Sequence, residues 1–498
     1  MYLKNQFLFF KESNFVKKVL QGTFFLVLGN VVSKLLMALA YLILARLFSP
    51  EEYGEFGMIK STVNNFLIFA TMGLGLTTTK YISEFKNTDK TKASGILGSS
   101  MFAILVLGTL VASIVVFFAE FIANDILHAP HLQSLLKISG FILVFSALYS
   151  VQVGALLGLQ NYKTSTIANI LQGLLVTIGL VVGGYFYGVE GAVIGNLVAV
   201  FVLALMIYFL LSKQARKIQI RPTISNFKKD IKEIYKFALP ASLATLITSP
   251  TYWLLNALLI RSENGLEHLG LYSAVIIFSS SLQLLNGSLN NVLLPIFLSK
   301  EIEVTYKKEF FNYYGAWIVS IIIALPFIFF PELVSFILGE KYPKDEVIKV
   351  LSISIFSTLI LANKQGVGRD LVMKNKMWLS VFSMGQWSIT ALGLYVLFKQ
   401  YGAVGFAAAI SIAYIINFIV VIPFFVKLKI TESYIMYNKW IFILWVFIGL
   451  LVILNIYLNY FLRISISIIL LICIYIFFKK LYNDNFKKYN QKLAESAK

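Results

Sequence analysis

Long apolar segments constrain this chain more than any other feature, because they recur from near residue 20 to near residue 478. Each is about twenty residues long, enough to cross a hydrocarbon core of roughly 30 Å as a helix. They are too long and too uniformly apolar for the ten-residue alternating strands of a membrane barrel. We predict about fourteen transmembrane helices, at 21–46, 56–79, 93–119, 135–159, 165–187, 192–211, 237–260, 271–298, 310–330, 347–365, 378–398, 406–426, 440–459 and 464–478.

The basic residues fall on one side of the predicted membrane. Of 43 Lys and Arg residues, 32 lie in the connections that share a side with the N-terminus, and 6 lie in the opposite set. Lys and Arg are enriched in cytoplasmic loops, so both termini are predicted to be cytoplasmic. The chain is expected in the cytoplasmic (inner) membrane, and its net charge of +19 indicates contact with anionic lipids rather than with nucleic acid.

An internal repeat divides the chain. At an offset of 214 residues, Gln172, Gly179 and the turn Tyr187–Gly191 match Gln386, Gly393 and the turn Tyr401–Gly405. Six helices per repeat is an even number, so the two lobes should be related by a pseudo-two-fold axis along the membrane normal. We predict an N-terminal lobe at 1–211, a basic cytoplasmic linker at 212–236, a C-terminal lobe at 237–426, and two further helices with a basic cytoplasmic tail at 427–498.

Five lysines, and no Asp or Glu, fall inside the predicted spans. A charged side chain at a helix centre costs about 2.5–3.5 kcal/mol on insertion scales, so such residues are candidates for function. Lys137 and Lys349 lie near the outer ends of their helices, where lysine stems snorkel to the interface. Lys34, Lys60 and Lys364 are the candidates for binding an anionic substrate such as phosphate.

Amide and hydroxyl side chains accompany these lysines at helical spacing. Asn30 lies one turn before Lys34, and Lys60 begins a stripe that continues through Asn64 to Thr71 and Thr78. Such groups suit the hydroxyl groups of a sugar, although they also hydrogen-bond neighbouring helices. The remaining candidates are a stripe on the eighth span and two arginines at equivalent outer helix ends: Gln283, Asn286, Asn290, Arg46 and Arg261.

Motifs for catalysis or cofactor binding are not found in the sequence. It has no GxxxxGK[ST] loop, so the chain is not itself a P-loop pump. We predict no metal site at His128 and His131, because no third ligand follows at useful spacing. The one cysteine, Cys473, cannot form an intrachain disulfide. We expect no catalytic residues, no metal and no cofactor.

Several turns resemble those of a known family. The segments Leu44–Gly54, Gly73–Gly75, Gly158–Tyr162, Tyr187–Ala192 and Phe237–Ala241 are similar to those of the Wzx-type oligosaccharide flippases, in the superfamily that includes multidrug and toxin extruders. The resemblance covers essentially the whole chain. It implies a MATE-like fold of two lobes that moves undecaprenyl-pyrophosphate-linked oligosaccharide (for O-antigen or another surface polysaccharide) across the membrane by alternating access, with a polysaccharide polymerase and other assembly proteins as partners.

Three alternatives remain open at the level of sequence. A peptidoglycan-precursor flippase and a cation-coupled multidrug exporter would share the fold, but drug exporters commonly use intramembrane carboxylates, which the predicted spans lack. A membrane-embedded polysaccharide polymerase would normally need a sizeable outer loop, and the predicted outer loops are short. The flippase is the reading that these observations favour.

Overall fold

The structure is a computed structural model, and it describes residues 14–225, 227–298, 306–374, 376–458 and 460–496, some of them without their side chains. These residues form helices and their connections, with no strand among them, which confirms the all-α prediction. Seven helical stretches in the described ranges are long and apolar enough to cross a membrane. The chain forms two compact units, which meet in sequence between Arg261 and Ser262.

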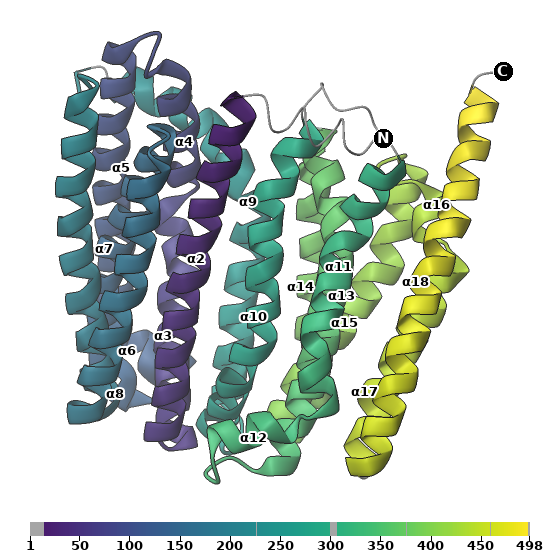
Figure 1. Cartoon of the computed structure of the whole chain (residues 1–498). Helices are drawn as coiled ribbons and strands as arrows, with labels where there is room; N and C mark the ends of the chain where they lie inside the picture. The colour runs from purple at the N-terminus through teal and green to yellow at the C-terminus, as the bar shows by residue number, and fades with distance from the viewer. Residues whose placement is uncertain (1–13, 226, 299–305, 375, 459, 497–498) are drawn as a thin grey trace. The chain divides into compact units, whose positions relative to one another are not determined.

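The first unit is a bundle of long helices (Figure 1). Its main helices are α2 (Asn14–Leu47), α3 (Pro50–Thr71), α4 (Leu74–Phe85), α5 (Lys90–Phe117), α7 (Gln133–Gly158), α8 (Tyr162–Lys217) and α9 (Phe227–Ile260). Three short turns, α6 (Ala119–Phe121), η1 (Ile122–Ile126) and η2 (Pro130–Leu132), connect α5 to α7. Ser49 and Glu52 form a capping box that fixes the start of α3.

Helix α8 contains two predicted spans, 165–187 and 192–211, folded back on each other. The helical backbone is interrupted at Tyr187 and Gly188, where Gly188 has a φ of 60°. A Cβ atom on Gly183 would lie 2.0 Å from the carbonyl oxygen of Gly191, so only glycine permits this approach. Gly179 and Gly195 approach each other in the same way, so paired glycines line this helix contact.

The second predicted span, 56–79, is not one continuous helix. Met72 and Gly73 adopt left-handed backbone conformations, with φ of 38° and 73°, and they separate α3 from α4. The polar stripe predicted from Lys60 to Thr78 is therefore wrong beyond Thr71, because the helical register does not continue through the break. The hydroxyl group of Thr78 instead donates to the carbonyl oxygen of Leu74 within α4.

The connection between α8 and α9 packs tightly against α5. The backbone N–H of Thr223 donates to the carbonyl oxygen of Ser94 over 3.1 Å, and the buried carboxylate of Asp230 accepts from Ser99 Oγ over 3.0 Å. A Cβ atom on Gly98 would lie 2.2 Å from the carbonyl oxygen of Thr223. The predicted linker 212–236 thus includes the end of α8 and the start of α9. The boundaries of the two lobes, at 211 and 237, remain a prediction.

The second unit contains the remaining helices. They are α10 (Gly265–Leu298), α11 (Tyr306–Phe329), α12 (Glu332–Leu338), α13 (Lys344–Met373), α14 (Trp378–Phe398), the short turn η3 (Lys399–Tyr401), α15 (Gly402–Lys427), α16 (Ser433–Met436), α17 (Lys439–Tyr457) and α18 (Tyr460–Ser496). Many apolar side chains of this unit are exposed, such as Ile389 at 76% and Val396 at 60%, as expected for surfaces that face lipid.

The predicted repeat has a structural counterpart in the turn between paired helices. Gly402, between α14 and α15, has φ 53° and ψ −132°, close to the φ 60° and ψ −146° of Gly188 within α8. A Cβ atom on Gly405 would lie 2.0 Å from the carbonyl oxygen of Phe398, so this turn is also closed by a glycine. The Tyr-Gly-x-x-Gly sequence therefore forms the same turn in both halves.

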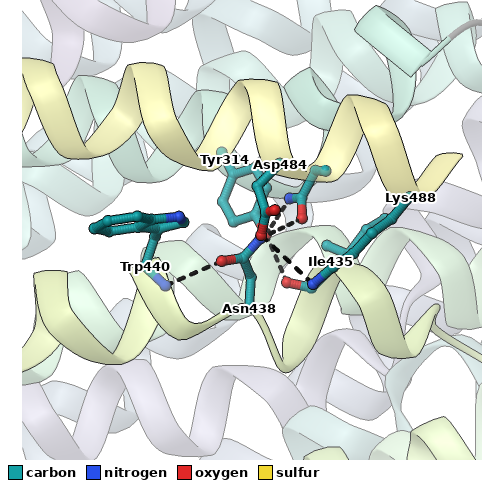
Figure 2. Close-up of polar contacts among 7 residues, drawn as sticks. Tyr314, Ile435, Asn438, Trp440, Asp484 and Lys488 are labelled. Carbon is teal, nitrogen blue, oxygen red and sulfur yellow. Dashed lines mark hydrogen bonds and ion pairs between the residues drawn. The ribbon is translucent and has the colours of Figure 1, made fainter.

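A buried polar network fixes the last helix to the rest of the second unit (Figure 2). The Nδ2 atom of Asn438 donates to Asn485 Oδ1 over 2.6 Å and to Asp484 Oδ2 over 2.9 Å on α18. The hydroxyl group of Tyr314 on α11 donates to the carbonyl oxygen of Ile435 over 2.7 Å and accepts from Asn485. The predicted cytoplasmic tail is thus a helical continuation of α18, held at residues 484 and 485.

Candidate binding site

A cavity of about 390 Å³ lies inside the first unit, between α2, α3, α7 and α8. Much of its lining is aliphatic, as in most small-molecule sites. The polar side chains that line it are Tyr41, Lys60, Asn64, Ser146, Tyr149, Ser150, Gln172 and Asn196. No Asp or Glu is present among its described lining residues, so the cavity contains one basic side chain and a set of neutral hydrogen-bonding groups.

Lys60 is the basic side chain of this cavity. Its Nζ atom lies 3.5 Å from the centre of the Tyr41 ring, a cation–π contact that holds the side chain between α3 and α2. The Tyr41 ring in turn packs on Phe56, with ring centres 6.1 Å apart. An aromatic face accepts no N–H proton in the directed way that a carboxylate does, so the ammonium group keeps its capacity to bind an anion.

A second set of hydrogen bonds lies behind the cavity wall. The Tyr149 hydroxyl group, which lines the cavity, donates to Asn169 Oδ1 over 3.1 Å. Asn169 Nδ2 then donates to Asn30 Oδ1 over 2.8 Å. Asn30, a predicted substrate-binding residue, thus acts here as a hydrogen-bond partner between α2 and α8, and it does not line the cavity.

Lys364 lies in a separate polar cluster in the second unit. Its Nζ atom donates to Ser383 Oγ on α14 over 2.8 Å and to Asn417 Oδ1 on α15. Asn417 Nδ2 donates to the carbonyl oxygen of Ser383 over 2.7 Å and to Gln386 Oε1. Lys364 and Lys60 therefore occupy different centres, one in each unit.

The other predicted residues that the structure describes lie outside the cavity. Lys34 is exposed on α2, seven residues before Tyr41 and so on nearly the same face. Arg46 and Gln283 are also exposed. Arg261 Nη2 contacts His128 Nε2 at 2.9 Å. The side chains of Asn286 and Asn290, on α10, lie outside the described residues.

The predicted outer loop of the first unit contains a further contact. His131 Nε2 lies 3.0 Å from Glu55 Oε1. Burial raises the pKa of Glu55, and the neighbouring imidazole opposes that shift. The two histidines of this loop therefore contact Arg261 and Glu55.

Several lining residues were not anticipated from the sequence. Ser146, Ser150 and Asn196 stand singly in apolar spans, and nothing in their spacing marks them. Gln172 could have been identified from the sequence, because the repeat aligns it with Gln386, which belongs to the Lys364 cluster. A repeated amide inside a membrane span is a candidate for a polar centre in each half.

Comparisons with known proteins place the chain in a family. A family model described as polysaccharide biosynthesis protein matches residues 19–300. No curated protein matches the chain.

Solved structures share the fold. An inward-facing multidrug resistance MATE family transporter of the MOP superfamily superposes with a TM-score of 0.61 at 17% identity, covering 82% of this chain and 96% of that chain. A MOP superfamily transporter from Pyrococcus furiosus, whose binding pocket is described as having reverse polarity that suggests a different function, gives 0.58 at 18% identity, with 83% and 95% covered. MATE in the straight conformation gives 0.59 at 19% identity, with 83% and 96% covered.

These likenesses carry different information. At identities below 25%, the solved structures define the fold alone, which is that of multi-pass membrane transporters. The family model covers more than half of the sequence and therefore defines the family. The chain belongs to the polysaccharide biosynthesis protein family.

Proposed function

We propose that the protein is a flippase that moves polyprenyl-diphosphate-linked oligosaccharide, with undecaprenyl as the lipid, across the cytoplasmic membrane by alternating access. The observation that carries the proposal is the cavity of the first unit, where Lys60 faces hydroxyl and amide groups with no acid in the described lining. A diphosphate needs a cation, and a sugar needs neutral donors and acceptors. The family supplies the context of polysaccharide synthesis.

The size of the cavity limits what it holds. A volume of about 390 Å³ is near the lower end of small-molecule sites and is too small for a whole lipid-linked oligosaccharide. In this proposal the cavity takes the diphosphate and the adjoining sugar, with Lys60 binding the diphosphate and Asn64, Gln172 and Asn196 binding hydroxyl groups. Lys34, exposed on the same face of α2 as Tyr41, is the cation that the substrate meets outside the cavity.

The multidrug exporter is the second candidate, because the solved structures with this fold include drug-resistance transporters. A lysine in an acid-free cavity repels a cationic drug, whereas it attracts a diphosphate, so the charge of the cavity favours the flippase. A peptidoglycan-precursor flippase handles the same diphosphate chemistry, and it differs in that its loss is lethal. A polysaccharide polymerase would need catalytic residues, and the cavity has no acid or histidine among its described lining.

The remaining parts of the proposal concern orientation and partners. Both termini face the cytoplasm, because the basic connections share their side. The basic surface meets anionic lipids there, and a polysaccharide polymerase receives the transported unit on the other side. The protein acts as a transporter and not as an enzyme.

A cellular experiment tests this proposal. A strain that lacks the gene should lose its surface polysaccharide and accumulate lipid-linked units in the inner leaflet. Wild-type protein should restore export, Lys60→Met should not, and Lys137→Met, which changes a lysine near a predicted helix end, should restore it. Export restored to wild-type level by Lys60→Met at equal protein abundance would contradict the proposed site. Lethality of the deletion would favour the peptidoglycan precursor, and loss of drug resistance with normal polysaccharide would favour the exporter.

A further inference from the structure

The wall of the Lys60 cavity that α7 and α8 form contains a hydroxyl group with a fixed direction. Tyr149 on α7 lines the cavity, and its side chain is 8% exposed. The hydroxyl group donates to Asn169 Oδ1 on α8 over 3.1 Å, and the carbonyl oxygen of Ala168 is a second acceptor 3.3 Å away. Neither acceptor lines the cavity. Because a phenol has a single O–H proton, the proton of Tyr149 points toward α8 and away from the cavity.

The orientation of the Asn169 amide is set by a residue on a third helix. Asn169 Nδ2 donates to Asn30 Oδ1 on α2 over 2.8 Å. The nitrogen of an amide side chain donates and its oxygen accepts, so the two ends are not interchangeable. Turning the Asn169 amide alone would bring its oxygen against the oxygen of Asn30. Asn30 therefore keeps Asn169 Oδ1 facing Tyr149 as an acceptor.

The helices that carry these two asparagines pack closely beside them. A Cβ atom on Gly29, next to Asn30, would lie 2.9 Å from Thr166 Cγ2 on α8. A Cβ atom on Gly173, about one turn after Asn169, would lie 2.6 Å from the Cα atom of Ser33 on α2. Side chains larger than glycine would hold α2 and α8 apart at both places. The hydrogen bond between Asn30 and Asn169 thus lies in a close helix contact.

The serine and amide side chains of the cavity are not fixed in this way. They are Ser146, Ser150, Asn64, Gln172 and Asn196, and the described residues provide no hydrogen-bond partner for them. A serine hydroxyl group rotates, and an amide turns over, so each of these groups donates or accepts as a ligand requires. The direction of the Tyr149 hydroxyl group is therefore a distinct constraint on what the cavity binds.

A fixed acceptor distinguishes between the two parts of the proposed substrate. No described residue donates to the Tyr149 oxygen, so its lone pair is left for a ligand in the cavity. The oxygens of a diphosphate only accept hydrogen bonds, and a second acceptor repels them. A sugar carries O–H groups, and often an acetamido N–H group, that donate. This wall of the cavity therefore suits the sugar, whereas Lys60 on α3 suits the diphosphate.

We propose that Tyr149 is a specificity-determining residue that accepts a hydrogen bond from a hydroxyl or acetamido N–H group of the sugar next to the diphosphate. Asn169 and Asn30 are positioning residues that hold the proton of Tyr149 away from the cavity. The substrate is then bound with its diphosphate toward Lys60 and its first sugar toward α7 and α8. The proposal rests on the proposed function, since it names the part of that substrate which this wall binds.

The test uses substrate probes that each lack one donor. Full-length protein is reconstituted in liposomes with fluorescent polyprenyl-diphosphate disaccharides. In each modified probe, fluorine replaces one hydroxyl group of the first sugar, or an acetoxy group replaces its acetamido group. Dithionite quenching of the outer leaflet gives the rate of movement. Wild-type protein should move one modified probe about tenfold more slowly than the unmodified probe, because the Tyr149 oxygen loses its donor.

Substitutions assign this preference to particular side chains. Tyr149→Phe has no acceptor and should move the two probes at rates within about twofold of each other. Asn30→Leu should also lower the preference, whereas Asn30→Asp, which keeps an oxygen for Asn169 Nδ2, should retain it. Tyr208→Phe, exposed on α8, is the matched control and should behave as wild type. The ratio of two rates in one preparation does not depend on how much protein is folded, so a merely structural role would leave it unchanged.

The outcomes separate this inference from the proposed function. Equal rates for all probes in the wild-type protein would overturn the inference, as would an unchanged preference in Tyr149→Phe, and in both cases the flippase would stand. If Tyr149→Phe does not fold, the Asn30 pair decides, and equal preference in Asn30→Leu and Asn30→Asp would overturn the inference. Absence of probe movement in the wild-type protein would overturn the proposed function, and the inference with it.

Discussion

Asn438 is predicted to be a main determinant of how the C-terminal helix is held. Its side chain is fully buried and makes three hydrogen bonds: Nδ2 donates to Asn485 Oδ1 and to Asp484 Oδ2, and Oδ1 accepts from the backbone N–H of Trp440 over 3.0 Å (Figure 2). Asn438→Ala removes all three. The Asn485 amide oxygen and the Trp440 N–H would then lose their partner in a buried site.

The magnitude follows from the groups left without a partner. A buried donor or acceptor that loses its hydrogen bond costs about 1–3 kcal/mol, and two such groups remain after the substitution. Asp484 adds little, because it is partly exposed and lies 3.5 Å from Lys488. We expect Asn438→Ala to lower the free energy of unfolding by about 3 kcal/mol.

Reversible unfolding by sodium dodecyl sulfate in mixed micelles measures this change. Asn485→Ala should cost about 2 kcal/mol, and the double variant should cost less than the sum of the two by about 1–2 kcal/mol, because both substitutions remove the same hydrogen bond. Asn490→Ala, exposed on the same helix, serves as the control and should lie within about 0.5 kcal/mol of wild type. A cost below about 0.5 kcal/mol for Asn438→Ala, or strict additivity of the pair, would refute the reasoning.

Three further predictions follow from particular sites. Gly183→Val should destabilise the first unit by more than about 3 kcal/mol, measured by the same unfolding assay, because its Cβ would lie 2.0 Å from the Gly191 carbonyl oxygen; a stable variant would contradict the tight hairpin. Lys60→Met should weaken binding of inorganic pyrophosphate to the purified protein about 10- to 100-fold by calorimetry, whereas Lys137→Met should not, and equal affinities would count against the cavity. Asp370 lies beyond the end of its predicted span, and burial raises its pKa from the ordinary value of 3.8 to about 6. The contribution of this side chain to stability is therefore present below about pH 4 and is lost as the pH rises through about 6. The unfolding free energy of wild type relative to Asp370→Asn should therefore fall by roughly 1–3 kcal/mol between pH 4 and pH 7, and a difference that does not change with pH would show that burial does not control this carboxyl group.

Features governed by local sequence were predictable. Apolar length alone predicts a membrane helix. The Tyr-Gly-x-x-Gly repeat predicted equivalent turns, and Gly188 and Gly402 have nearly the same positive φ, which glycine adopts without strain. The glycines of α8 that flank this turn are also visible in the sequence, and small residues at such spacing permit the close helix contact that the structure shows.

Features governed by tertiary contacts were not predictable from the sequence. The break at Met72 and Gly73 lies inside an apolar run that reads as one span, and no proline marks it. The partners of Lys364 come from two later helices, and neither Ser383 nor Asn417 stands out in its own apolar segment. Periodicity placed Lys60 and Asn64 on one face, but the groups opposite them come from α7 and α8, which sequence spacing does not bring together.

Translocation of the substrate tests the central claim most directly. Liposomes with purified protein and a fluorescent polyprenyl-diphosphate oligosaccharide, assayed by dithionite quenching of the outer leaflet, give the rate of movement between leaflets. The account predicts rapid movement by the wild-type protein, at least a tenfold lower rate for Lys60→Met, and little movement of a probe in which a neutral linker replaces the diphosphate. Movement of the neutral probe as fast as the diphosphate probe, unaffected by Lys60→Met, would contradict the claim that a cationic cavity moves an anionic lipid-linked glycan.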